Sequence, residues 1–488
     1  MSRPCALNGN MAAPTTNSDD ISASIARILN EKHSPEHLQV LQTFTALLQD
    51  REYRDAVGGK AFSGLLKVLS RLRDELQASS GSDYNLKLQL AAECFRAQRN
   101  SCVQSSRNQC LLRELGFVDV SLQLLRFLYT NSKSRDGVFE PVRCGIQFLG
   151  NLAVGNQVCK DDIWQRSFPD LFLQLLSVDD EKTVSHTSMV LHTCLDEAKV
   201  EELSEPQNIQ LALKVMELCR TQPELDWTVL IATQHFLKSA ALVEKMYAAM
   251  SSCERLTLLE LISAQLSGEE SLDCGVPSNV ARFLASAFQK GCGAVLTLAT
   301  GSASSEEVLQ EALTVIGLLD VLCEMTSHQA QFLQDQPDLL VTTVELLKQV
   351  HAIGKASKNI FSSAQNFSTP SDEDDPSSES PVVSFKAHLI RLIGNLCYTH
   401  ANNQNKVREL EGLPLILDNC NIDSNNPFIS QWSVFAIRNL LEHNRKNQEL
   451  VASLERCGAA DYSALRELGF QVEERDGSLL LKPVRKDA

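Results

Sequence analysis

Asparagine recurs in this sequence at the end of apolar helical patterns, where its carboxamide could bind another stretch of polypeptide. A carboxamide offers two N–H donors and one carbonyl acceptor, the groups that pair with a peptide backbone. The positions that share this setting are Asn100, Asn151, Asn395 and Asn439. The same amides could instead satisfy backbone groups of a neighbouring repeat. We favour this second interpretation, because the four members form two separated pairs.

An Asn-Gln pair follows three of these asparagines after eight residues. The pairs are Asn108-Gln109, Asn403-Gln404 and Asn447-Gln448. After Asn151 a comparable pair, Asn156-Gln157, comes only five residues later. We interpret it as a shorter-spaced version of the same pattern.

Motifs for nucleotide binding and hydrolysis are absent, since the sequence has no G-x-x-x-x-G-K-[ST], G-x-S-x-G or H-E-x-x-H. His33 and His37 have metal-like spacing, but Pro35 between them disrupts a shared helical face. His186 and His192, six residues apart, do not face the same side of a helix. We therefore expect no catalytic residue, no cofactor and no metal site. Each histidine is expected to be solvated or to make a single hydrogen bond.

The composition indicates a cytosolic protein with an acidic surface. Net charge is −16 and no run of five basic residues occurs, so binding to nucleic acid or anionic lipid is not expected. The 15 cysteines are scattered among apolar residues without a C-x-x-C pair, which favours reduced thiols. Residues 1–17 lack the apolar stretch of a signal peptide, and no apolar run is long enough for a membrane span.

The elements that must position the asparagines are helices. Asn395 and Asn439 recur with a period in the forties, which is typical of HEAT or armadillo repeats. We expect an all-α, right-handed superhelical solenoid, with a small C-terminal β-hairpin around Asp476-Gly477. The expected organisation is a disordered N-terminus at 1–20, a helical-repeat array at 21–361, an acidic disordered loop at 362–383 and a C-terminal repeat domain at 384–488.

The most readable repeat runs from 403 to 442. A short first helix should end at Gly412, and a second should carry Pro414 in its opening turn. Asn426-Pro427 should supply the N-cap and the first-turn proline of the third helix. That third helix contains Trp432 and Asn439.

This unit resembles an armadillo repeat, whose pattern is close to W-A-x-x-N-L, then N-Q, then G-x-x-P-x-L. In that family the asparagine faces a concave groove and can bind an extended peptide, often beside a tryptophan one turn earlier. Only Trp432 resembles that tryptophan here. The resemblance gives as groove candidates Asn100, Asn151, Asn395, Trp432, Arg438 and Asn439.

A closer resemblance is to the C-terminal domain of the ataxin-10 family, carried by 391–397, 412–420 and 435–440. It implies a non-enzymatic scaffold in the cytoplasm, often perinuclear, and also at the midbody and the centrosome or cilium basal body. The implied roles are neuron survival and neurite outgrowth through Ras–MAP kinase signalling, cytokinesis and cilium function. The implied partners are O-GlcNAc transferase, a G-protein β subunit and mitotic kinases, with a possible homo-oligomer.

The acidic loop contains three candidate phosphorylation sites. Thr369-Pro370 and Ser380-Pro381 fit proline-directed kinases, and Ser371 precedes Asp-Glu-Asp, which suits an acid-directed kinase. The alternative, which we favour, is a solvated linker without regulation.

Two other functions remain open. An importin-type transport adaptor would carry a basic peptide in an acidic groove, but it would need a regular Trp–Asn ladder. A divergent enzyme would need a cluster of titratable groups, and none is visible in the sequence. The C-terminal hairpin could cap the last helix, which we favour, or offer an edge to another copy.

Overall fold

The computed structural model describes most of the chain. The described ranges are 18–78, 83–131, 137–267, 276–300, 306–329, 331–363, 382–421, 423–454, 470–475 and 478–483. The chain divides into two compact units, Met1–His235 and Phe236–Ala488.

The described part of the first unit is built from helices, and most of them are amphipathic. They are α1 (Ser18–Asn30), α2 (Pro35–Leu47), α3 (Arg51–Ala56), α4 (Gly59–Ala78), α5 (Tyr84–Cys102), α6 (Ser106–Leu115), α7 (Phe117–Asn131), α8 (Phe139–Ala153), α9 (Gln157–Ser167), α10 (Asp170–Leu176), α11 (Glu181–Cys194), α12 (Glu197–Leu203), α13 (Ile209–Thr221) and α14 (Asp226–Gln234).

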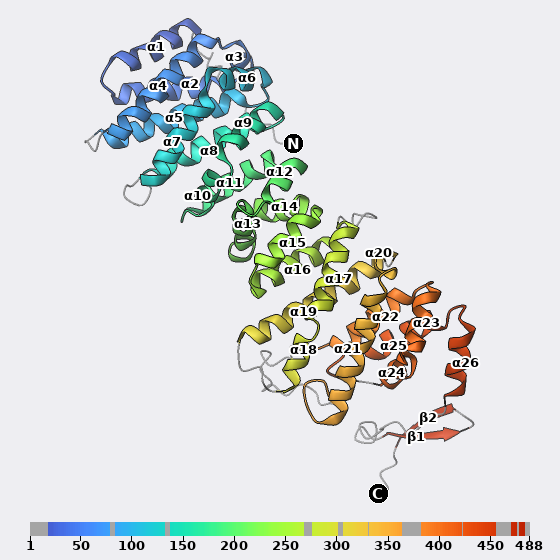
Figure 1. Ribbon diagram of the computed structural model, residues 1–488. Helices are drawn as coiled ribbons and strands as arrows, with labels where there is room; N and C mark the ends of the chain where they lie inside the picture. Colours follow the sequence, from blue (N-terminus) through green and yellow to red (C-terminus); the bar gives the residue numbers. More distant parts are fainter. Residues whose placement is uncertain are drawn as a thin grey trace, which may run out of the picture. The chain divides into compact units, whose positions relative to one another are not determined.

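From α3 onward the helices of this unit repeat in threes. In each repeat two outer helices are followed by a third, and the third helices α5, α8, α11 and α14 pack against one another in succession (Figure 1). The third helix α5 also packs on α2. Helix α5 lies between α2 and α8, so most of its residues are buried. A helix packed on two sides needs apolar residues around most of its circumference.

The second unit continues with helices and ends in a hairpin. Its elements are η1 (Phe236–Lys238), α15 (Ala240–Ala249), α16 (Ser252–Leu266), α17 (Ser278–Gly291), α18 (Ala294–Thr297), η2 (Leu298–Thr300), α19 (Glu306–Gln329), α20 (Gln331–Gln334), α21 (Pro337–Ala356), α22 (Phe385–Cys397), α23 (Ala401–Glu409), α24 (Gly412–Asp418), α25 (Ile429–Leu441), α26 (Arg445–Ser453), β1 (Phe470–Arg475) and β2 (Ser478–Pro483).

The third helices of this unit are α16, α19, α22 and α25, which pack in that order. Strands β1 and β2 pair antiparallel, with Phe470 opposite Pro483 and Arg475 opposite Ser478. The predicted all-α repeat fold with a C-terminal hairpin is therefore confirmed, while the Asp476-Gly477 turn lies outside the described residues.

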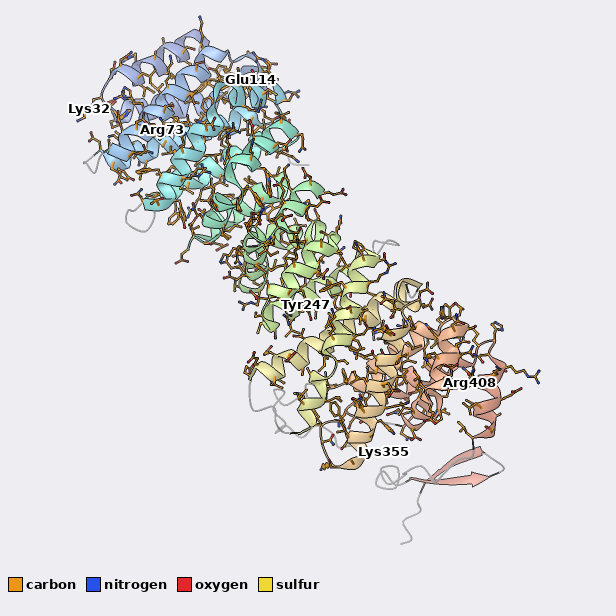
Figure 2. All side chains as sticks on the ribbon, in the orientation of Figure 1. Lys32, Arg73, Glu114, Tyr247, Lys355 and Arg408 are labelled. Atoms are coloured by element: carbon orange, nitrogen blue, oxygen red, sulfur yellow. The ribbon has the colours of Figure 1, made fainter. Side chains whose placement is uncertain are left out.

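The core of each repeat is apolar. Phenylalanine fills much of it, as at Phe95 and Phe148, which are fully buried. Charged side chains such as Lys32 and Lys355 project outward (Figure 2). Burial of this apolar surface supplies the main favourable term in folding.

Two predictions about the clearest repeat are wrong in detail. Gly412 begins α24 rather than ending α23, and the left-handed residue before it is Glu411, at φ 55°. Asn426 does not cap its own third helix. Its Oδ1 accepts from the backbone N–H of Lys386 (3.0 Å) and Ala387 (3.4 Å), so it caps α22 of the preceding repeat.

The expected domain boundaries stay predictions. Helix α1 begins at Ser18, and the predicted disorder before it falls on residues 1–17, outside the described part. The acidic loop expected at 362–383 falls within the second unit, and its residues 364–381 are likewise outside.

Candidate functional site: the face of the third helices

The four recurrent asparagines occupy one structural position. Each lies three residues before the C-cap of a third helix: Asn100 on α5, Asn151 on α8, Asn395 on α22 and Asn439 on α25. The residue four positions after each asparagine adopts a left-handed backbone conformation. The residues with positive φ are Gln104 (52°), Gly155 (70°), Thr399 (49°) and His443 (54°).

After α22 the turn leaves one backbone carbonyl without its helical donor, and the asparagine of the next repeat binds that carbonyl. The N–H of Tyr398 bonds Asn395 O instead of continuing the α-helical pattern, so Gly394 O loses its donor. Asn439 Nδ2 donates to this Gly394 O at 3.0 Å. The amide thereby satisfies a backbone carbonyl that would otherwise be unpaired.

The same geometry occurs once in the first unit, between α5 and α8. Val103 N bonds Asn100 O, and Asn151 Nδ2 donates to the bypassed Arg99 O at 3.1 Å. Asn100 Nδ2 donates in turn to Thr45 O of α2, also at 3.1 Å. The amide hydrogens therefore link successive third helices.

Asn395 makes a related but different link. Its Nδ2 donates to Thr326 Oγ1 at 2.9 Å and to Cys323 O at 3.2 Å, both on α19. Across the described residues, Oδ1 of Asn151, Asn395 and Asn439 has no protein donor. A peptide that bound to these three side chains would therefore have to donate its hydrogen bonds to their Oδ1 atoms.

The Asn-Gln pairs add hydrogen bonds between neighbouring repeats. Asn403 Nδ2 donates backward to Gln334 O and to Leu396 O, while Gln404 Nε2 donates forward to Asn439 O at 2.9 Å. Gln109 bridges forward in the same way, to Asn151 O and Val154 O, both at 2.9 Å.

The interpretation of Asn156-Gln157 as a short-spaced pair is wrong. Asn156 is the N-cap of α9, and its Oδ1 accepts from Cys159 N at 3.1 Å. Asn444 plays this capping role before α26. The true equivalent of the pair asparagine is Cys159, which is fully buried, eight residues after Asn151. A fixed eight-residue offset from the helix asparagine is the signal that would have found it.

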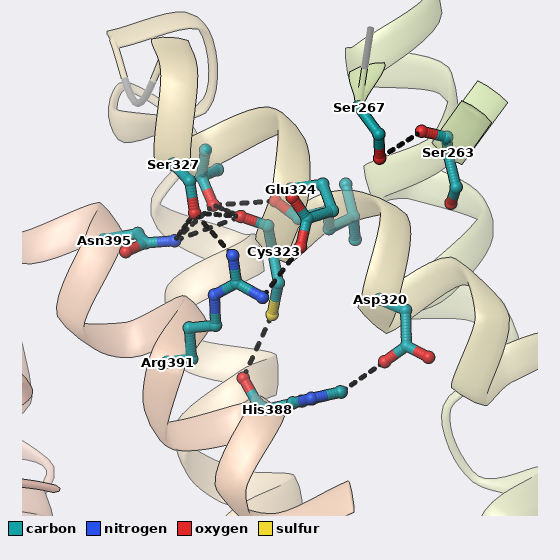
Figure 3. A network of polar contacts seen from close by, with 11 residues as sticks. Ser263, Ser267, Asp320, Cys323, Glu324, Ser327, His388, Arg391 and Asn395 are labelled. Carbon is teal, nitrogen blue, oxygen red and sulfur yellow. Dashed lines mark hydrogen bonds and ion pairs between the residues drawn. The ribbon is translucent and has the colours of Figure 1, made fainter. Parts of the chain in front are cut away.

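Three third helices of the second unit present a charged and aromatic face. Figure 3 shows Asp320 and Glu324 of α19 meeting His388 and Arg391 of α22. Arg391 Nη1 lies 2.9 Å from Glu324 Oε1. The guanidinium carbon of Arg391 also lies 4.7 Å from the ring centroid of Trp432, which is a cation–π contact.

The last helix of this face, α25, carries the remaining groove candidates. Trp432 is half-buried, and its ring meets Phe435 edge-on with centroids 5.8 Å apart. The side chain of Arg438 is exposed and has no ion pair or hydrogen bond to any described residue. The structure thus places Asn395 and Asn439 near the ends of α22 and α25, with Trp432 near the start of α25. It leaves the Arg438 side chain without a partner among the described residues.

On the corresponding face of the first unit, polar side chains join neighbouring third helices, and the sequence did not predict these contacts. Arg99 Nη1 donates to Gln147 Oε1 at 2.6 Å, and Gln147 Nε2 lies 2.9 Å from His186 Nε2. Burial lowers the pKa of His186. Asp180 Oδ2 accepts from Arg143 Nε at 2.8 Å, and this hydrogen bond lowers the pKa of Asp180 to about 2.

The other candidate residues, the histidines and the phosphorylation sites, do not form a functional site in the described part. Within it, no group of three or more His, Cys, Asp or Glu side chains could hold a metal ion. His33 and His37 are buried rather than solvated, and each has one glutamate neighbour, at 3.2 Å in both cases. The phosphorylation candidates Thr369, Ser371 and Ser380 lie outside the described residues.

The cysteines within the described ranges are all free, and most are buried. Burial raises the pKa of Cys194 to about 12, which keeps it a neutral thiol at physiological pH. Within these ranges, none of the helices combines the length and apolar character needed to cross a membrane.

Stacked three-helix repeats linked through their third helices define an armadillo-type helical-repeat scaffold. The family model described as "Spinocerebellar ataxia type 10 protein domain" matches residues 385–482. The chain is 42% identical to Ataxin-10 of Xenopus tropicalis over 98% of its length and 99% of the relative, and 39% identical to Ataxin-10 of Homo sapiens over 92% and 95%. The chain belongs to the ataxin-10 family.

Solved structures are more distant. An engineered protein is 12% identical, with a TM-score of 0.39, and covers 87% of this chain and 99% of its own. A designed armadillo repeat protein in complex with the peptide (KR)4 is 14% identical, with a TM-score of 0.31, over 61% of this chain and 99% of its own.

Proposed function

We propose that this chain is a non-enzymatic scaffold that binds other proteins on the face of its third helices, with one binding surface in each unit. The observation that carries the proposal is on α25. There the exposed Arg438 side chain has no partner among the described residues, Trp432 is half-buried against Arg391, and Asn439 Oδ1 has no donor among the described residues. Exposed cationic and aromatic groups of this kind are typical energetic centres of protein interfaces.

Family membership supports the finer assignment. The proposed setting is cytoplasmic and perinuclear, with recruitment to the midbody and to the centrosome or cilium basal body. The proposed processes are neurite outgrowth and neuron survival through Ras–MAP kinase signalling, cytokinesis and cilium function. The proposed partners are O-GlcNAc transferase, a G-protein β subunit and mitotic kinases.

One contact weighs against the importin-type alternative. A basic peptide would use the tryptophan ring face as its binding slot, but the chain's own Arg391 already stacks on Trp432. Glu324, which could attract a basic peptide, is already paired with the same arginine. A cationic ligand would have to displace both contacts.

The proposal is tested by measuring binding of purified full-length chain to O-GlcNAc transferase and to a G-protein β subunit. The double variant Trp432→Ala, Arg438→Glu should bind at least one of them about tenfold more weakly, a change of about 1.4 kcal/mol. Arg445→Glu is the matched control, because the Arg445 side chain is 88% exposed on α26 and, among the described residues, pairs with Glu449 alone. Unchanged affinity of the double variant for every partner would refute the proposal.

Phosphorylation of Thr369, Ser371 and Ser380 remains part of the proposal, on the sequence grounds given above. Phosphopeptide mass spectrometry on protein from dividing cells tests it, and an unmodified segment would remove it. Self-association through the C-terminal hairpin is tested separately, by comparing the sedimentation of the full chain and of residues 1–465.

A further inference from the structure

A cavity of about 380 Å³ lies in the second unit, between the outer helices α15 and α17 and the third helices α16 and α19. Tyr247 of α15, labelled in Figure 2, is one of its lining residues. Helix α19 lines the cavity with residues from 311 to 318, whereas Asn395 contacts α19 at Cys323 and Thr326. The cavity is therefore separate from the asparagine contacts, and its volume is at the lower end of small-molecule pockets.

Arg255 supplies the inner positive charge of this cavity. Its side chain is half-buried, its Nε donates to Tyr247 O at 2.9 Å, and its guanidinium carbon lies 4.6 Å from the centroid of the Tyr247 ring. These two contacts fix the guanidinium plane, while Nη1 and Nη2 have no hydrogen bond or ion pair with any described residue. A guanidinium held in this way keeps N–H donors available in the fork geometry that binds a carboxylate.

One wall of the cavity is apolar. The half-buried ring of Tyr247 meets the ring of Phe283 edge-on, with the two centroids 5.5 Å apart. Val315 and Leu318 of α19 line the same cavity and are buried. An uncharged aliphatic or aromatic group would be stabilised here, because contact with this wall removes it from water.

The remaining charges of the cavity lie on exposed side chains. They are Glu244, Glu311 and Lys290, and none of the three has an ion pair or a side-chain hydrogen bond with a described residue. Charges of both signs act on one hydroxyl: burial raises the pKa of Tyr247, Arg255 lowers it and Glu311 raises it. A ligand that satisfies these groups therefore carries a negative and a positive group close together.

We propose that this cavity binds a free α-amino acid with an apolar side chain. The carboxylate pairs with the Nη groups of Arg255, the ammonium group pairs with Glu311, and the side chain packs on Val315 and Leu318. A simple anion would meet the two glutamates, and a simple cation would meet Arg255, so a zwitterion matches the charges best. The site uses none of the residues of the partner-binding face proposed above, and it adds a small-molecule ligand to the scaffold.

The test is an isothermal titration of the full chain with L-leucine and three analogues: N-acetyl-L-leucine, L-leucinamide and L-serine. L-leucine should bind saturably. The analogues lack the ammonium group, the carboxylate and the apolar side chain, respectively, and each should bind about tenfold more weakly or worse. No saturable binding of L-leucine, or an analogue that binds as tightly as L-leucine, overturns the proposal.

Matched variants assign the two charged groups. Arg255→Gln should weaken L-leucine about tenfold. Glu311→Gln, on an exposed side chain that the fold does not use, should weaken L-leucine but leave N-acetyl-L-leucine unchanged. Arg282→Gln is the control, because Arg282 is exposed on α17 and does not line the cavity.

Circular dichroism verifies that each variant is folded. Full L-leucine affinity in Glu311→Gln, or in a folded Arg255→Gln, overturns the proposal. Partner binding through Trp432 and Arg438 is measured separately, so the small-molecule site and the scaffold role can fail independently.

Discussion

Asn439 is 2% exposed, and the carbonyl of Gly394 that it satisfies belongs to the preceding third helix. A side chain at this position therefore acts on two repeats at once. Because the donor replaces one that the left-handed turn removes, the asparagine is tied to the turn and not only to the helix that carries it.

Replacing Asn439 by alanine should lower the free energy of unfolding by about 1–2 kcal/mol, because Gly394 O is left buried without a partner. Urea denaturation followed by circular dichroism measures the loss. Asn402→Ala is the control, since Asn402 is exposed on α23 and should change stability by less than about 0.5 kcal/mol. Equal stability of both variants would show that the link is dispensable.

Asp180 gives a pH-dependent test. Its carboxyl, 11% exposed, is paired with Arg143, and its folded pKa of about 2 lies below the unfolded value. A depressed carboxyl pKa stabilises the fold above about pH 4, and this contribution declines as the pH falls toward the folded pKa.

Asp180→Asn preserves an acceptor for the N-cap bond to Thr183 N but removes the charge. The variant should be less stable by about 2 kcal/mol at pH 7, and the difference should shrink by about 1 kcal/mol at pH 3. Denaturant titrations at both pH values measure it. A difference independent of pH would mean that the ion pair contributes nothing.

At the scale of elements, the sequence predicts the third helices well and their connections poorly. Apolar spacing and recurring Asn395 and Asn439 identify α22 and α25. The cap of α22 escaped prediction because Asn426 lies 40 residues away, on the next repeat. The left-handed turns could not be predicted because residues other than glycine, such as Gln104 and Thr399, occupy them. Glycine is the residue that usually indicates such a backbone conformation.

The blurred region between the two asparagine pairs also has a structural reason. At the end of α8 the N–H of Val154 still bonds Gly150 O, so this carbonyl keeps its donor. The next third helix, α11, has His192 rather than asparagine three residues before its C-cap, Leu195. Among the site residues, the helix asparagines could be predicted, but the lack of a partner for the Arg438 side chain became visible only in the three-dimensional packing.

Close approach of third helices depends on glycine at two positions. A Cβ on Gly394 would lie 3.0 Å from the Phe435 ring and 3.1 Å from Ala436 Cα, whereas a Cβ on Gly150 would meet the flexible end of Met189 at 2.6 Å. Gly394→Ala should therefore cost about 1–3 kcal/mol, and Gly150→Ala less, because methionine can move aside. Thermal unfolding of the two variants compares them directly, and the reverse order would contradict this packing argument.

At the scale of the whole molecule, each unit offers its own third-helix face. On this face the first unit carries a chain of polar contacts from Arg99 through Gln147 to His186. The second carries Arg391 stacked on Trp432 and the free Arg438. Their different chemistry predicts different partners for the two units, as expected for a scaffold that joins proteins.

The central claim is that the third-helix face of the second unit recruits partner proteins. It is tested most directly by proximity labelling in dividing cells that express the full chain, the Trp432→Ala, Arg438→Glu variant or the Arg445→Glu control at equal levels. The account predicts that one defined set of neighbours is lost in the face variant alone, while all other neighbours remain. Identical neighbours for all three chains would contradict it.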